Sequence, residues 1–278
     1  MGKDPINAFS DLGLDLAVDP ETGDKDRKFV TALARGLEVL RAFKPGEGFL
    51  GNQEIARRTG LPKPTVTRLT YTLTRLGYLS YSQRLERYSL GTGVLALGYA
   101  TLSNFGVRQI ARPLMQELAD TVDASVSLGM RERLNMIYLE HARGNSALTL
   151  RLDVGSRIPV GSTAMGRAFL AALPDAERNY LMDHIKRHAA ERWPTVRRGI
   201  ERSLRYYEQH GYVKTVGTWE RDVNAVGVAL VQPENGEIYA FNCGGPSFSL
   251  PEERLDADLG PRLKNLAHNV QAGLSHLG

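Results

Sequence analysis

The residues whose chemistry is easiest to interpret lie together in one short segment, "KPTVTRLTY" at residues 63–71. Its lysine, arginine, tyrosine and threonine side chains can all contact phosphate oxygens. Arg68 is also long enough to pair with the O6 and N7 atoms of a guanine, and threonine methyl groups can contact a thymine methyl group. The segment therefore indicates contact with a nucleic acid.

The apolar residues of the same region indicate which element holds these side chains. Val66, Leu69, Leu73 and Leu76 recur at steps of three, four and three, which is the spacing of one face of an α-helix. We therefore expect a helix over residues 64–76, with the hydroxyl groups and the arginine opposite the core. Threonine is a middling helix former, so a solvated helix with incidental threonines is the alternative.

Two further helices are predicted before this one. Residues 29–43 place apolar side chains on one helical face, and "KPGEG" then ends the pattern. The expected buried face consists of Leu33, Leu37, Leu40 and Phe43, with Val30 and Val39 at its edge. A second helix is predicted over residues 52–60, with Asn52 as its N-cap and Gly60 ending it in a left-handed conformation. Pro62 prevents its continuation.

Alternating apolar and polar positions in "YLSYSQRLERYSL", residues 78–90, predict a β-hairpin after the third helix. The order helix, helix, tight turn, helix and hairpin is typical of a winged helix-turn-helix, in which the second helix of the pair enters the major groove of DNA. The expected DNA contacts are Asn52, Lys63, Pro64, Thr65, Thr67, Arg68 and Tyr71 around the third helix, and Arg84 and Arg87 in the wing.

The charge distribution also favours a polyanionic partner for this segment. Residues 27–90 contain twelve Lys and Arg against four Asp and Glu, whereas residues 1–26 contain two against seven. The rest of the chain is close to neutral, and the whole chain carries +4. A compact basic segment beside a neutral remainder is typical of a nucleic-acid-binding module joined to another domain, although a solvated basic face would give the same balance.

Length and composition exclude several classes of protein. The 278 residues allow two modest domains, and 42% hydrophobic and 24% charged residues are ordinary for a globular protein. No apolar run is long enough to cross a membrane, and the N-terminus lacks the pattern of a secretory signal. Cys243 is the only cysteine, which rules out an internal disulfide bond. We expect a cytoplasmic protein with no membrane partner and no cofactor.

The second half predicts a mixed sheet flanked by helices, so the expected fold class is α+β with more than one domain. Residues 92–106 predict a connecting helix whose apolar face needs a partner, which could be a second subunit. Paired strands are expected within 125–142 and within 224–246, where "NG" is a hairpin turn, and a further strand at 146–155. The remaining helices are expected within 161–173, 174–191, 196–211 and 251–277.

Two histidine-containing patterns in the second half could suggest an enzyme. His184 and His188 share a helix face, but Ile185 occupies the position where a zinc protease carries its glutamate. A solvated face is the better interpretation. Glu140 and His141 are neighbours, and on a strand they would point to opposite faces. Neither pattern predicts a metal site or a catalytic pair.

The single cysteine does not complete an active site either. Cys243 lies in "FNCGGP", which offers no base to activate a thiol. We expect a buried and inert side chain. The sequence therefore contains no catalytic constellation.

At the level of the whole sequence, the chain resembles the IclR family of bacterial transcription regulators over residues 28–278. The matching stretches are "ARGLEVLRAF", "QEIARRTGLPKPTVTRLTYTLTRLGYL", "YSLGTGVLALG", "GSRIPVGSTAMGRAFLA", the "GY" at 211–212 and the "GGP" at 244–246. They occur in the order that the family has. Among members, the N-terminal part and the acidic tail look most like regulators of aromatic-acid catabolism.

The resemblance implies four parts: a flexible acidic tail at 1–27, a winged helix at 28–91, a linker and dimerisation helix at 92–106, and a GAF-like mixed α/β effector-binding domain at 107–278. It also implies a homodimer or a dimer of dimers. Such an assembly would bind double-stranded operator DNA of palindromic sequence and respond to a small-molecule effector, an organic acid.

In family members the effector lies against the loop that opens a helix of the second domain. The matching residues here are Ser162, Thr163, Ala164, Met165 and Gly166. N–H groups at a helix N-terminus attract a carboxylate, and small residues allow close approach of a ligand. A packed turn without a ligand is the alternative.

Four further effector positions of the family do not keep the residue types of members that bind small keto acids. They match Thr215, Ala225, Asn242 and Gly244. Leu150 and Ile158 would add apolar walls. A mostly apolar pocket with few polar groups suits a larger or less polar ligand, such as an aromatic acid.

The sequence therefore predicts a ligand-responsive, DNA-binding transcription regulator and not an enzyme. The alternative is a DNA-binding protein whose C-terminal domain serves only oligomerisation. A ligand that changes the affinity for operator DNA would distinguish the two.

Overall fold

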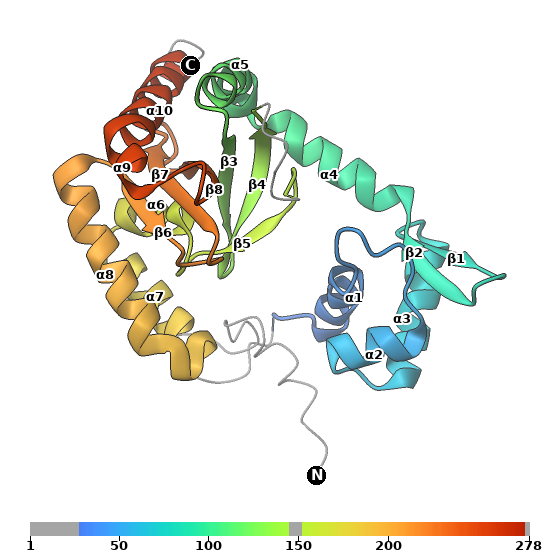
Figure 1. The fold of residues 1–278 in the computed structure, drawn as a ribbon. Helices are drawn as coiled ribbons and strands as arrows, with labels where there is room; N and C mark the ends of the chain where they lie inside the picture. The colour runs from blue at the N-terminus through green and yellow to red at the C-terminus, as the bar shows by residue number, and fades with distance from the viewer. Residues whose placement is uncertain (1–27, 145–151, 276–278) are drawn as a thin grey trace. The chain divides into compact units, whose positions relative to one another are not determined.

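The structure, a computed structural model, describes residues 28–144 and 152–275 (Figure 1). The expected acidic tail at 1–27 lies outside these residues. The chain divides into two compact units, Met1–Asn104 and Phe105–Gly278, and each is described by itself.

The first unit has the element order predicted from the sequence, three helices followed by a β-hairpin (Figure 1). The helices are α1 (Thr31–Arg41), α2 (Asn52–Thr59) and α3 (Lys63–Arg75), and the hairpin pairs β1 (Leu79–Ser82) with β2 (Arg87–Leu90). An antiparallel bridge between Leu50 and Tyr88, with two backbone hydrogen bonds of 2.8 Å, ties the hairpin to the loop between α1 and α2. The hairpin, or wing, is therefore held to the helices by this bridge as well as by the covalent chain.

Glycine and proline residues determine where α2 ends and α3 begins. Gly60 ends α2 in the left-handed conformation with φ 68°, as predicted. Pro62 and Pro64 flank the first residue of α3, where a missing N–H leaves no helical hydrogen bond unmade. The predicted N-cap of α2, Asn52, is wrong. Gly51 caps the helix, because its extended backbone places its carbonyl to accept from N–H groups three and four residues later.

The core of the first unit is small and apolar. It consists of Val39, Ala42, Phe43, Leu50, Ile55, Leu61, Val66 and Leu79. The expected α1 face is partly wrong, since Leu33 and Leu37 are 62% and 50% exposed. On the predicted apolar face of the third helix, Leu76 is also 62% exposed. The reason is that α1 packs through Val39 and the residues after it, and α3 ends at Arg75.

The helix that follows the hairpin, α4 (Thr92–Asn104), has no buried residue. Its apolar side chains Leu95, Leu97 and Tyr99 are 73%, 57% and 71% exposed. Large exposed apolar surfaces commonly mark interaction sites. Neither α4 nor any other helix in the described ranges is long and apolar enough to cross a membrane.

The second unit is built on one antiparallel sheet. Its strands are β3 (Ser125–Glu132), β4 (Asn135–Ala142), β5 (Arg157–Pro159), β6 (Val213–Val216), β7 (Val223–Val231) and β8 (Ile238–Pro246), in the spatial order β5-β4-β3-β8-β7-β6. The predicted strand pairs β3–β4 and β7–β8 are confirmed. The strand expected at 146–155 lies mostly outside the described residues, and residues 152–156 form a turn that leads into β5.

Long helices cover both faces of this sheet (Figure 1). One face carries α5 (Gly106–Val122) and α10 (Gly260–Ser275), which pack together, and the other carries α6 (Ala164–Ala172) with α7 (Asp175–Ala189) and α8 (Trp193–His210) outside it. Short helical segments are η2 (Ala190–Arg192), α9 (Glu252–Arg254) and a π-helical turn, η3 (Leu255–Leu259). This mixed α/β arrangement is the one expected from the sequence.

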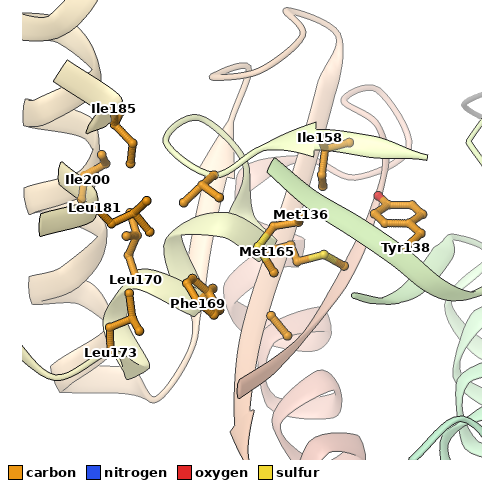
Figure 2. Packing of buried hydrophobic residues seen from close by; sticks show 12 residues of the cluster. Met136, Tyr138, Ile158, Met165, Phe169, Leu170, Leu173, Leu181, Ile185 and Ile200 are labelled. Carbon is orange, nitrogen blue, oxygen red and sulfur yellow. The ribbon is translucent and has the colours of Figure 1, made fainter. Parts of the chain in front are cut away.

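A continuous apolar cluster joins the sheet to the outer helices. Met165 and Phe169 on α6 lie beside Met136 of the sheet, whereas Leu170 lies toward Leu181 on α7 (Figure 2). α6 is therefore packed on both sides, which explains why seven of its nine residues are buried.

A β-bulge in β4 changes which side chains face α6. Ser127 pairs with His141 and Gly129 pairs with Tyr138, so β4 has one more residue than β3 between these pairs. Side chains three apart on a regular strand point to opposite faces. The bulge brings Tyr138 and His141 to the same face, where their rings stack with centroids 5.8 Å apart. It also turns Glu140 to the opposite face, where it pairs with α5.

The start of α6 approaches the preceding backbone so closely that it requires glycine. A Cβ atom at Gly166 would lie 2.3 to 2.6 Å from backbone atoms of Val160. We expect Gly166→Ala to lower the free energy of unfolding by about 1–3 kcal/mol, because only a backbone shift can relieve the overlap. Denaturant titration measures the change. Gly106→Ala is the control, since nothing lies within 4 Å of its Cβ position; equal effects would contradict the constraint.

Candidate DNA-binding surface and ligand pocket

α3 presents most of the residues predicted to contact DNA to solvent. Thr65 is half-buried, and Val66 and Thr70 are buried, so Thr70 belongs to the core side and not to the expected exposed row of hydroxyls. The exposed members are Lys63, Pro64, Thr67, Arg68 and Tyr71. The helix therefore has the two-sided character that a recognition helix needs.

The threonine hydroxyls of α3 are engaged within the helix. Thr67, Thr72 and Thr74 donate to the carbonyl four residues earlier, at 3.1, 3.0 and 2.8 Å. A threonine hydroxyl has one hydrogen, so in these rotamers the groups can accept a hydrogen bond but cannot donate another. Donation from Thr67 to a phosphate oxygen, as expected from the sequence, therefore requires rotation of its side chain.

Asn52 connects α2 to α3. Its Nδ2 atom donates to Oγ1 of Thr67, and its Oδ1 atom accepts from Oγ1 of Thr70, both at 3.4 Å. These contacts cross from one helix of the pair to the other. Asn52 thus helps to set the angle at which α3 presents Arg68.

The basic residues of the first unit differ in their surroundings. Arg58 is engaged internally: it donates to the carbonyl of Ala42 at 2.9 Å and pairs with Glu47 and Glu54. Four exposed cations, in contrast, form no ion pair with any residue in the described ranges: Lys63, Arg68, Arg84 and Arg87. These cations lie on α3 and in the hairpin, so their charge is available to an external polyanion.

The second unit contains a pocket between the start of α6 and the sheet face that α6 covers. Its empty volume, which includes open solvent at its mouth, is about 490 Å³. Seven residues predicted at the effector site line it: Ile158, Thr163, Ala164, Thr215, Ala225, Asn242 and Gly244. Seven others were not assigned to it by the sequence: Ser125, Ser127, Tyr138, His141, Leu152, Trp219 and Val223.

The loop before α6 is organised by Thr163. Its Oγ1 atom accepts from the N–H of Gly166 at 3.2 Å and donates to the carbonyl of Pro159 at 2.7 Å. Thr163 is therefore the N-cap of α6. Thr163 and the first helical residue, Ala164, border the pocket.

The other predicted loop residues are placed differently. Met165 is fully buried in the apolar cluster, and Gly166 packs against backbone. The carbonyl of Ser162 accepts from the hydroxyl of Thr218 at 2.7 Å. These residues support the loop and are not among the residues that line the pocket, and Leu150 lies outside the described residues.

A hydrogen-bonded row of side chains crosses the floor of the pocket. His141, Ser127 and Asn242 are direct cross-strand neighbours on β4, β3 and β8. Oγ of Ser127 lies 2.8 Å from Nδ1 of His141, and the hydroxyl of Tyr138 is hydrogen-bonded to Ser127 and, at 3.5 Å, to Nδ2 of Asn242. Nε2 of His141 and Oδ1 of Asn242 are buried and have no hydrogen-bond partner within the described part of the chain.

The polar groups of this row are electrically neutral near pH 7. Burial, followed by the charge of Arg143, lowers the pKa of His141 below its ordinary value. Burial raises the pKa of Tyr138. Among the described residues, the pocket lining contains no Lys, Arg, Asp or Glu, so hydrogen bonds and not ion pairs dominate the polar chemistry of this part of the pocket.

The residues considered for catalysis have other surroundings. Cys243 is fully buried, and burial raises the pKa of its thiol to about 12. The expectation of a solvated histidine face is wrong for His184, which is 3% exposed because it shares its helix face with Leu181 and Ile185; His188 is exposed. Among the described residues, no group of His, Cys, Asp or Glu could hold a metal ion.

Comparison with known proteins covers both units. Residues 32–83 match the IclR helix-turn-helix domain, and residues 99–272 match the family described as bacterial transcriptional regulator IclR C-terminal. The chain belongs to the IclR family. It is therefore a DNA-binding transcriptional regulator and not an enzyme, because the family and the relatives are regulators.

Individual IclR-family members agree over most of the chain. HTH-type transcriptional regulator TsaQ1/TsaQ2 of Comamonas testosteroni is 37% identical over 87% of this chain and 88% of its own length. An IclR family transcriptional regulator from Brucella abortus, of known crystal structure, is 47% identical with a TM-score of 0.84, covering 98% of this chain and 99% of that one. An IclR homolog from Microbacterium hydrocarbonoxydans, crystallised with 4-hydroxybenzoate, shares the fold at 21% identity and a TM-score of 0.67, over 88% and 99%.

The exposed, unpaired guanidinium on α3 gives a direct test of the DNA-binding surface. Arg68→Ala should weaken binding to the DNA upstream of the gene by about 1–3 kcal/mol and relax the preference for one base pair. Fluorescence anisotropy with operator and scrambled DNA measures both. Arg197→Ala, which removes an exposed arginine from α8 of the other unit, should change little. An unchanged affinity and base preference of the Arg68 variant would contradict the assignment.

The buried cysteine gives a test of the second unit. Because its pKa is about 12, only about one thiol in ten thousand is ionised at pH 8, and the folded chain should not react with Ellman's reagent at Cys243. Unfolding in guanidinium should lower the pKa to its ordinary value and release one reactive thiol per chain. Rapid reaction without denaturant would show that the thiol is accessible.

Proposed function

We propose that this IclR-family regulator binds a palindromic operator as a dimer or a tetramer, and that a small organic acid changes its affinity for that operator. The observation that carries the proposal is the pocket beside α6, which combines apolar walls with a few polar atoms at its floor. Pockets of this composition commonly bind small molecules. An oligomerisation domain without an effector has no need of buried polar atoms that lack a partner in the described part of the chain.

An aromatic acid suits this pocket better than a small keto acid. The rings of Tyr138 and Trp219 and the side chains of Leu152 and Ile158 provide flat and apolar walls. The lining residues that the structure describes include no cationic side chain, so an acid group would be held by N–H groups at the start of α6, next to Ala164. The 4-hydroxybenzoate complex of the Microbacterium homolog gives one example of an aromatic acid on this fold.

The exposed apolar face of α4 supports a dimer. A second copy of this helix would cover Leu95 and Tyr99, which lie four residues apart on one side of the helix and are 73% and 71% exposed. A two-fold dimer presents two α3 helices to the two halves of a palindrome. The effector would act by binding two arrangements of the dimer with different affinity, since only differential affinity shifts such an equilibrium.

Anisotropy of fluorescent operator DNA tests the whole proposal. We expect tight binding to the upstream DNA of the gene, weaker binding to scrambled DNA, and a steep loss of affinity as salt increases. An aromatic acid that binds the protein should change operator affinity by about fivefold or more. Operator binding that no ligand alters would favour the alternative of a purely oligomerising second unit.

A pocket variant then locates the effector site. Ala164→Leu should remove the response to the acid while salt-sensitive DNA binding persists, because the added atoms occupy the pocket next to the start of α6. Ala171→Leu, on the same helix outside the lining, is the control. A normal ligand response in the Ala164 variant would place the effector elsewhere, and circular dichroism establishes that each variant is folded.

A further inference from the structure

The exposed cations of α3 and the wing lack a counter-charge in the part of the chain that the structure describes. They are Lys63, Arg68, Arg84 and Arg87, and we refer to them as the outer cations. Three acids of this unit are paired elsewhere: Glu38 with Arg41, Glu47 with Arg58, and Glu54 with Arg57 and Arg58. Glu86 is exposed in the wing and supplies one negative charge against these four positive ones.

The residues that precede α1 carry the opposite charge. Residues 1–26, which we call the acidic segment, contain seven Asp and Glu against two Lys, whereas residues 27–90 contain four Asp and Glu against twelve Lys and Arg. The acids are distributed along the segment, from Asp4 to Asp26, and do not form one cluster. One chain therefore contains both a surface for a polyanion and a polyanionic segment of its own.

The acidic segment is long enough to reach the outer cations. It leads into α1, and α1 packs against α3 within the first unit. An extended chain covers about 3.3–3.6 Å per residue, so the residues between Asp15 and α1 span up to about 50 Å. A compact unit of this size is only about 30 Å across. Tethering also gives the segment an effective concentration in the millimolar range, so charge contacts that are weak between separate molecules become populated.

Carboxylates and phosphates bind the outer cations in the same way. Arginine pairs with either group in the same fork geometry, and lysine pairs with either as a point charge. The acidic segment and duplex DNA therefore need the same side chains and exclude each other. DNA carries about one negative charge per 1.7 Å of its axis, whereas the segment has seven acids in 26 residues. DNA at sufficient concentration thus displaces the segment.

We propose that the acidic segment docks on α3 and the wing in the free protein and competes with DNA for the outer cations. This inference goes beyond the proposed function, because it concerns the DNA-binding surface and is independent of the pocket and its effector. Docking stabilises the DNA-free state, so it lowers the affinity for operator and nonspecific DNA by the same factor. Nonspecific DNA, which binds almost entirely through charge, is then left largely unoccupied at concentrations that still fill an operator.

Carbodiimide cross-linking of the full-length protein, read by mass spectrometry, tests the contact directly. The reagent joins a carboxylate to an amine where the two touch, and Lys63 is the outer cation that has an amine. We expect links from residues 1–26 to Lys63 in the free protein and their loss in excess duplex DNA. Lys44, an exposed lysine of the same unit, is the control and should link less. Equal links at Lys44 and Lys63, or links to Lys63 that DNA does not remove, would overturn the inference.

Neutral side chains in the acidic segment measure its effect on DNA binding. The substitutions are Asp11→Asn, Asp15→Asn, Asp19→Asn and Glu21→Gln. Affinity for scrambled duplex DNA, measured by anisotropy, should rise about threefold or more at about 50 mM salt, because the competing contacts are weakened. The affinities of the variant and the unaltered protein should converge as salt increases, since salt screens the contacts of the segment as well.

A matched variant loses the same number of charges from exposed acids of the second unit. Its substitutions are Glu208→Gln, Glu220→Gln, Glu234→Gln and Glu253→Gln. The two variants have the same net charge, so an equal gain of affinity in both would show that only overall charge matters, which contradicts docking. No gain in the segment variant at low salt would refute the inference as well. A gain confined to the segment variant, together with the Lys63 links, is the result that we expect.

Discussion

Close contact between the start of α6 and bare backbone is the constraint on which the second unit depends. A Cβ atom at Gly227 would overlap the carbonyl of Ala164, one at Gly129 would overlap the sulfur of Met165, and Gly166 lies against Val160. Because no side chain intervenes at these points, the helix N-terminus is held over the middle of the sheet. The pocket lies between this helix start and the sheet, where Ser125, Ala225 and Gly244 are small lining residues.

In the first unit, hydrogen bonds hold the helices and the wing in place. Asn52 joins α2 to α3, the hydroxyl groups of α3 bond to its own carbonyls, and the Leu50–Tyr88 bridge joins the wing to the loop between α1 and α2. Internal acids neutralise Arg58, while Arg68 and the wing arginines remain unpaired within the described residues. The unit thus uses its polar groups to fix its shape and presents its remaining positive charge outward.

Local sequence patterns predicted the parts of this structure that have local causes. The apolar spacing in residues 63–76 predicted α3, and Gly60 and the "NG" turn supplied the positive φ values that end α2 and join β7 to β8. α1 was predicted, but its buried face was partly wrong, because apolar residues on two adjacent faces compete and tertiary packing selects Val39. The assignment of Asn52 as an N-cap was also wrong, because its side chain bonds to Thr67 and Thr70 on another helix, and the local sequence does not show these contacts.

The pocket shows the same division between local and tertiary causes. The loop at Thr163 and Ala164 could be located from its resemblance to a family motif, whereas Ser127, Tyr138 and His141 were not assigned to the pocket. Their grouping depends on strand register and on a bulge, and register is set by pairing partners far away in the sequence. The adjacent polar residues "EH" within an otherwise apolar strand were the one sequence feature that marked this irregularity.

The small residues of the pocket floor have a consequence for how ligand preference can diverge among related regulators. Ser125, Ala225 and Gly244 have little or nothing to lose, so substitution at these three positions can only add atoms and favour a smaller ligand. Room for a larger one has to come from the rim, where Leu152 and Trp219 can be shortened. New specificities are therefore reached by opposite kinds of mutation at the two ends of the cavity, and the helix contacts that hold it open need not change.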